Sequence, residues 1–159
     1  MSAPGFLPLL LLCVGFVLGG STRAHAQAAA SDVQASVLIV LGSSQGSGTD
    51  PELAKLEALK KPPFDGFPRK ALLKRFDVQL VRGKESELAL PNGRKLRLSL
   101  LERTADGRYR VSVSINRPGQ SDYLPVMTVN AAAGDPFFVA GQKHEGGTLI
   151  IGVSVGKAG

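Results

Sequence analysis

Apolar residues occupy every second position over long parts of the second half of this chain. In the segment 95–100 every second residue is leucine, and in the segment 109–115 tyrosine, valine and isoleucine alternate with polar residues. Successive side chains of a β-strand point to opposite faces, so each segment has one apolar and one polar face. This pattern is typical of an antiparallel sheet with one face on a core. It favours a β-sandwich or barrel over a fold built from βαβ units.

The turns between these segments predict how the strands pair. Residues 91–93 are Pro-Asn-Gly, a sequence suited to a three-residue hairpin loop with its glycine in the left-handed conformation. This loop places Leu88 opposite Leu96. A following Asp-Gly turn closes a second hairpin and places Leu98 opposite Val113. Both pairs are apolar against apolar, which supports the predicted register.

Similar patterns predict the remaining strands of a single domain over residues 33–156. Short apolar or alternating runs are bounded by Gly, Pro and Asp. The predicted strands cover 33–41, 76–80, 88–90, 95–100, 109–116, 123–130, 136–140 and 148–155. The fold class is therefore mainly β, an antiparallel β-sandwich or open barrel with one short N-terminal helix.

That helix is predicted at about residues 50–60. Thr49-Asp50-Pro51-Glu52 resembles a helix start in two alternative ways. With Thr49 as N-cap, Glu52 completes a capping box, and with Asp50 as N-cap, Pro51 takes the favoured first helical position. Leucines then recur at every third position, and two consecutive prolines follow at 62–63. Proline cannot continue a helical hydrogen-bond ladder, so the helix should end before them.

The first 26 residues have the order of a Sec signal peptide. A 13-residue run from Phe6 to Leu18, apolar apart from its proline and glycine, follows a short start, and Ala-His-Ala at 24–26 supplies small residues for cleavage. The run is shorter than the roughly 20 residues of a membrane-spanning helix. We therefore expect export, to the periplasm or the extracellular space, and a flexible new N-terminus over 27–32. The mature chain would have no transmembrane helix and no cysteine, because Cys13 leaves with the signal peptide.

The chain contains the elements of a serine hydrolase, but in an unsuitable context. Gly42–Gly46 matches the G-x-S-x-G motif around Ser44, and Asp122 or Asp135 followed by His144 completes the chain order of a triad. The motif requires a helix immediately after the serine, and here a Gly-Ser-Gly segment intervenes. A solvent-facing turn histidine is the simpler interpretation of His144. We expect no enzyme activity, and the sequence predicts neither a cofactor nor a metal site.

Positive charge is concentrated between residues 60 and 110, where 14 basic residues stand against six acidic ones. The predicted register places Lys95, Arg97 and Arg110 on one sheet face, where their potentials add and can attract anions. An anion-binding module for acidic glycan or lipid is therefore one hypothesis, and an ordinary solvated sheet face is the alternative. Nucleic acid is not an expected partner, because this exported chain has no tryptophan and no aromatic residue is predicted on that face.

Three segments resemble small exported β-rich bacterial proteins of unassigned function: Leu90–Leu96, Phe138–Gly141 and Gly146–Ile151. The resemblance covers about residues 37–155, implies an exported β-rich domain and implies no activity. Together with the signal peptide, it leads to the main hypothesis: an exported, non-enzymatic cell-envelope binding or structural accessory protein. Its expected partner is an unidentified envelope protein or acidic polymer.

Overall fold

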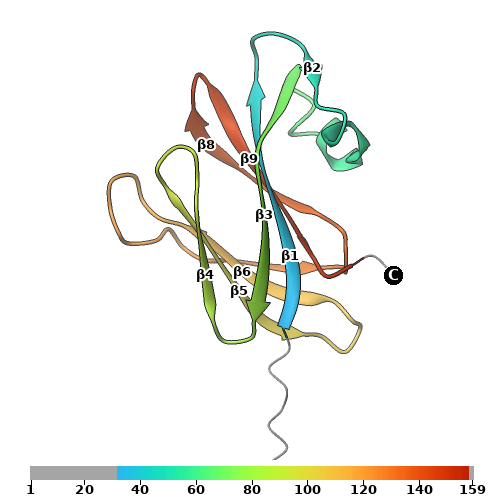
Figure 1. Cartoon of the computed structure of the whole chain (residues 1–159), viewed down its shortest axis with the longest axis vertical. Coiled ribbons are helices and arrows are strands. Elements are labelled where there is room, and N and C mark those ends of the chain that lie inside the picture. The colour runs from blue at the N-terminus through green and yellow to red at the C-terminus, as the bar shows by residue number, and fades with distance from the viewer. Residues whose placement is uncertain (1–31, 158–159) are drawn as a thin grey trace, which may run out of the picture.

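A computed structural model describes residues 32–157, and two β-sheets build it (Figure 1). The predicted signal peptide at 1–26 and the segment 27–31 lie outside the described residues. The first sheet has the strand order β2-β3-β1-β9-β8 and the second the order β4-β5-β6-β7. The prediction of a mainly β, sandwich-like fold is confirmed. Within residues 32–157, no helix has both the length and the apolar character needed to cross a bilayer.

Residues 32–157 contain nine strands and two short 3-10 turns. They are β1 (Asp32–Ser43), β2 (Gly48–Thr49), η1 (Leu53–Lys55), η2 (Glu57–Lys60), β3 (Arg69–Val81), β4 (Glu85–Ala89), β5 (Lys95–Arg103), β6 (Tyr109–Ile115), β7 (Met127–Ala131), β8 (Phe137–His144) and β9 (Gly147–Val155).

The second sheet follows the register that its turns predict. Leu88 of β4 pairs with Leu96 of β5, and Leu98 pairs with Val113 of β6. A β-bulge between Leu100 and Glu102 then shifts the β5–β6 pairing by one residue. The register of these hairpins can be predicted from a few neighbouring residues, because loop length and turn type determine it.

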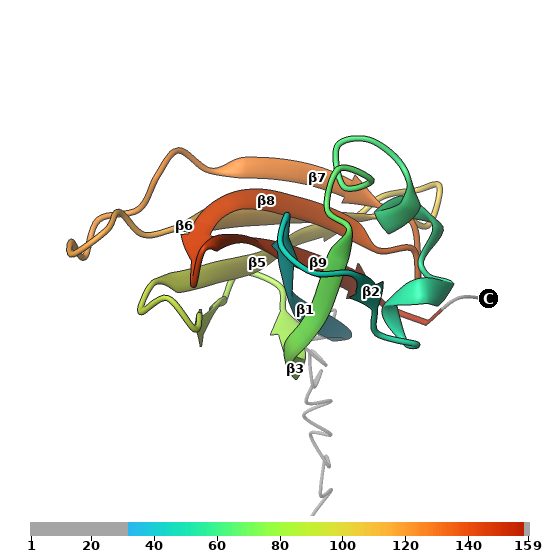
Figure 2. The same cartoon turned by 90° about the horizontal axis from the view of Figure 1, so that it is seen from above.

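The core lies between the two sheets and takes one face of each. Sixteen buried side chains form it: Val33, Ala35, Val37, Ile39, Leu80, Leu90, Leu96, Leu98, Leu100, Val111, Val113, Ile115, Leu149, Ile151, Val153 and Val155. Because alternate residues of each strand enter this core, the residues between them face outward. Figure 2 views the arrangement from above and shows β7 of the second sheet next to β8 of the first.

The structure corrects the single helix predicted at about residues 50–60. Leu56 adopts an extended conformation between the 3-10 turns η1 and η2, so no continuous helix forms. Leu53 and Leu59 are buried in a second, smaller core on the outer face of the first sheet.

Asp50, one of the two expected helix caps, makes a different contact. Neither turn has a side-chain cap, and the Asp50 carboxylate instead accepts a hydrogen bond from the backbone N–H of Leu72 at 2.6 Å. Glu52 pairs with Arg75 of β3. Both acids therefore attach the turns to β3, which begins at Arg69, earlier than its alternation predicts.

Candidate functional site

The outer face of the second sheet carries the three cations that the sequence analysis selected. Lys95 and Arg97 alternate with buried leucines of β5, and Arg110 pairs with Glu102 beyond the β-bulge. All three therefore lie on the face opposite the core. The structure brings Lys95 and Arg97 to one pocket, whereas Arg110 does not line it.

Each of these cations already has a carboxylate partner on the same face. Arg97 Nη2 lies 2.9 Å from Glu87 Oε1, and Arg97 Nη1 lies 3.2 Å from Glu85 Oε2. Lys95 Nζ is 3.6 Å from the second oxygen of Glu87. Arg110 is paired in the same way with Glu102, at 2.9 Å. Three glutamates thus offset the charge of three cations, so the face is less positive than its basic residues suggest.

Tyr123 is the functional-site residue that sequence reasoning missed. Its ring lies under the Arg97 guanidinium, with 3.7 Å from Cζ to the ring centroid, and its hydroxyl donates to Glu87 Oε1 at 2.7 Å. This corrects the expectation that no aromatic residue lies on the basic face. An isolated β-bridge between Tyr123 and Asn116 positions Tyr123 on the basic face. The sequence around β6 and β7 contains no local pattern that predicts this bridge.

The contacts of Glu87 change its acidity. Hydrogen bonds from Arg97 and then from Tyr123 lower the pKa of Glu87 from 4.5 to about 2. Loss of hydration, followed by the hydrogen bond to Glu87, raises the pKa of Tyr123. The pKa of Arg97 is also raised, first by its hydrogen bond to Glu87. Glu87 therefore remains ionised at neutral pH and holds Arg97 and Tyr123 together.

A pocket of about 520 Å³ opens beside this cluster, between Lys95, Arg97 and the loop 119–121. Buried Asn116 holds the loop: its Oδ1 accepts from the N–H of Lys95 at 2.6 Å, and its Nδ2 donates to the carbonyl of Gln120 at 2.8 Å. The pocket walls carry both signs of charge and several neutral polar groups. Such a pocket can hold a polar ligand, but an anion would also meet the carboxylate of Glu87.

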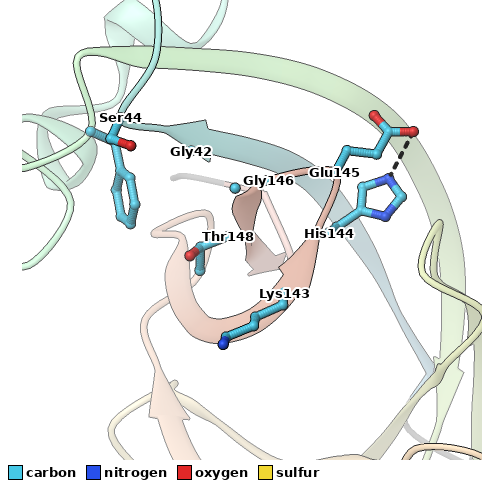
Figure 3. Close-up of a pocket in the computed structure, with 9 residues that line it drawn as sticks. Gly42, Ser44, Lys143, His144, Glu145, Gly146 and Thr148 are labelled. Carbon is cyan, nitrogen blue, oxygen red and sulfur yellow. Dashed lines mark ion pairs between the residues drawn. The ribbon is translucent and has the colours of Figure 1, made fainter.

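Ser44 and His144 line a different pocket, of about 600 Å³, at the end of the first sheet where β1 ends and β8 turns into β9 (Figure 3). The His144 ring is directed toward Glu145, with 3.7 Å between Nε2 and Oε1. Asp122 is paired with Arg117 at 3.0 Å, and in the described part of the chain neither Asp122 nor Asp135 lines this pocket. The structure thus brings Ser44 and His144 to one cavity without either predicted aspartate.

The position of His144 differs from the expected solvent-facing turn. His144 is the last residue of β8, and its side chain is only 15% exposed. The turn itself consists of Glu145 and Gly146, both with positive φ. The strand continues beyond the predicted end because β8 pairs with β9 up to His144–Gly147, after a bulge at Ala140/Gln142.

A third feature lies at the border of the second sheet, on β7 and on the segment just before it. Leu124, Val126 and Met127 have exposed fractions of 36%, 62% and 46%, although all three are apolar. Leu124 and Met127 also line an apolar pocket of about 230 Å³ whose other wall includes Val139 and Ala140 of β8. A sequence signal for this surface exists, because no residue from 123 to 133 is charged. We call residues 123–131 the neutral edge.

The described residues 32–157 contain no cluster of three or more His, Cys, Asp or Glu side chains suited to a metal ion. No protein-family model, curated protein or solved structure matches the chain.

Proposed function

We propose that the protein is an exported, non-enzymatic accessory protein of the cell envelope that binds a protein partner along the neutral edge. The observation that carries this proposal is the exposure of Met127 on the border strand β7 and of Leu124 and Val126 just before it, in a stretch without charge. Exposed apolar residues gathered in one place are typical of interaction surfaces. An open sheet edge adds unpaired backbone groups that a partner strand can bind.

The other long sheet edges differ in charge. β4 carries Glu85 and Glu87, whereas β8 is uncharged from Phe137 to Gln142 and has one cation, Lys143, near its end. β2 has only two residues, so β3 with its lysines and arginines borders most of the first sheet. Charged residues on an edge disfavour pairing with another chain. The neutral edge lacks the charges of β4 and β3, and its exposed apolar residues distinguish it from them; this contrast supports a role in binding.

Export is supported by the predicted signal peptide and by the resemblance to small exported bacterial proteins. Cell fractionation with N-terminal sequencing of the recovered protein tests it. We expect the protein outside the cytoplasm with an N-terminus at Gln27. A protein recovered from the cytoplasm with residues 1–26 intact would contradict this part of the proposal.

A photo-crosslinking amino acid at position 126, used in intact cells, tests the binding surface. The matched control is position 101, because Leu101 is 40% exposed at the end of β5, in the same sheet but away from the neutral edge. We expect one defined protein to be crosslinked from position 126 and not from 101. We also expect Thr128→Lys on β7 to remove the crosslink, because it places a charge on the edge. Equal crosslinking from both positions would refute the proposal.

The anion-binding module remains a second candidate because Lys95 and Arg97 line one pocket beside Tyr123. The ion pairs with Glu85 and Glu87 count against it, since an anion must compete with them. The candidate predicts binding of an acidic glycan such as heparin that weakens steeply as salt is added. Glu87→Gln should strengthen that binding and Lys95→Gln should weaken it. Equal binding by both variants would exclude this pocket as the anion site.

A further inference from the structure

We propose that the partner on the neutral edge is a second copy of this chain, which pairs its β7 antiparallel with β7 of the first across a two-fold axis. This inference rests on the proposed function and names the partner for it. The resulting dimer would have one continuous eight-stranded sheet, because the sheets β4-β5-β6-β7 of the two copies join at their border strands β7.

Symmetry selects which edge of a sheet can pair with its own copy. A two-fold axis places each residue near itself or near its close neighbours in the other copy. An edge with charges of one sign, such as β4 with Glu85 and Glu87, then meets its own charges, and like charges opposite each other are destabilising. β7 has the sequence MTVNA, and its flanks are neutral from Tyr123 to Ala133. Its charge pattern therefore permits self-pairing, whereas that of β4 opposes it.

The faces of β7 also suit a second copy. Met127 and Val129 pair with the buried residues Val113 and Val111 of β6, so both lie on the core side of the sheet. Met127 is nevertheless 46% exposed, because β7 is the last strand of its sheet and no strand is hydrogen-bonded beyond it, although β8 lines the same apolar pocket. A second β7 adds that strand and brings its own apolar core side next to Met127. Antiparallel pairing thus removes the same apolar surface from water in both copies.

Thr128 and Asn130 point to the outer face, since they pair with Ser112 and Arg110. They carry no charge that would repel the copy, and neither contributes to the buried core. Pro125 lies just before β7 and has no N–H to donate, so pairing is confined to the five residues 127–131. A short paired strand gives a small interface, and the dimer should therefore dissociate on dilution.

Sedimentation velocity of the protein, purified from the cells that make it, tests the inference over a concentration series. We expect twice the monomer mass at high concentration and Thr128→Lys to be monomeric throughout. Ser99→Lys is the matched control: it adds the same charge on the same outer face, two strands away from β7, and should still dimerise. Unchanged circular dichroism and thermal midpoints would show that both variants are folded, as expected for substitutions outside the core.

A charge swap makes the test specific for pairing of β7 with itself. Thr128→Glu should also be monomeric, and an equimolar mixture of Thr128→Lys and Thr128→Glu should regain the dimer mass, because pairing of 127–131 makes the two residues 128 diagonal neighbours on the outer face, within reach of long side chains of opposite charge. A wild-type protein that stays monomeric at all concentrations would overturn the inference. So would a dimer that Thr128→Lys leaves intact. If the wild type is monomeric but position 126 still crosslinks one foreign protein in cells, the proposed function holds and only the second copy is refuted.

Discussion

Two leucines of β5 allow a direct test of how this sandwich is stabilised. Leu98 is completely buried between the sheets, and Leu101 is 40% exposed at the bulge that follows Leu100. Truncating Leu98 to alanine removes three carbon groups from the core, worth about 2.4 kcal/mol at about 0.8 kcal/mol each. The cavity left behind adds to this loss, so we expect Leu98→Ala to cost about 2.5–5 kcal/mol.

Leu101→Ala makes the same chemical change on the same strand and should cost less than about 1 kcal/mol, because its side chain is already partly in water. Urea unfolding followed by far-ultraviolet circular dichroism is the suitable assay, since the chain has no tryptophan. With a slope of about 1.5 kcal/mol/M, Leu98→Ala should lower the midpoint by about 2–3 M. Equal losses for the two variants would refute the argument, because they would show that the bulge does not place Leu101 outside the core.

Three further outcomes follow from individual contacts. Glu87 has a folded pKa of about 2 against an ordinary 4.5, so its contribution to stability is complete above pH 4.5 and is lost as the pH falls toward 2. Carboxyl NMR titration should give that low midpoint, and Glu87→Gln should flatten the pH dependence of unfolding between pH 2 and 4.5. Gly147→Ala places a Cβ 2.6 Å from the Gly42 carbonyl oxygen and should cost about 1–3 kcal/mol, whereas Gly66→Ala meets no atom and should be neutral. Asn116→Ala leaves the Lys95 N–H and Gln120 carbonyl without their partner, so we expect a loss of about 1–3 kcal/mol in urea unfolding and faster proteolysis near residue 120.

The main error in predicting the fold arose where the sequence supported two similar structures. The spacing of Leu53, Leu56 and Leu59 was compatible with a short helix, and the chain forms two 3-10 turns instead. The backbone of β3 decided the outcome, because the N–H of Leu72 takes the Asp50 carboxylate that would otherwise serve as a helix cap. That contact joins residues 22 positions apart, and a local pattern contains no information about it.

The candidate sites likewise combine features that a local pattern predicts with contacts between residues far apart in the sequence. Alternation correctly placed Lys95, Arg97 and Arg110 on one face, because side-chain direction in a strand depends only on position. It did not reveal that Glu87 and Tyr123 complete the contacts of Arg97. Tyr123 reaches Arg97 from 26 positions away, after the chain has passed through β6 and a loop.

The amino-acid sequence by itself determined the two hairpin registers that join β4, β5 and β6, because alternation and turn chemistry act over a few residues. The strand predicted at 123–130 begins only at Met127, after Pro125, and forms β7 (Met127–Ala131). The sequence alone also shows that the stretch 123–133 has no charged residue. Only the tertiary structure decided that this stretch borders a sheet, next to β8 and with its apolar side chains exposed. The physical reason is that a sheet edge is defined by which strands are absent beside it, and this depends on the pairing of the whole chain.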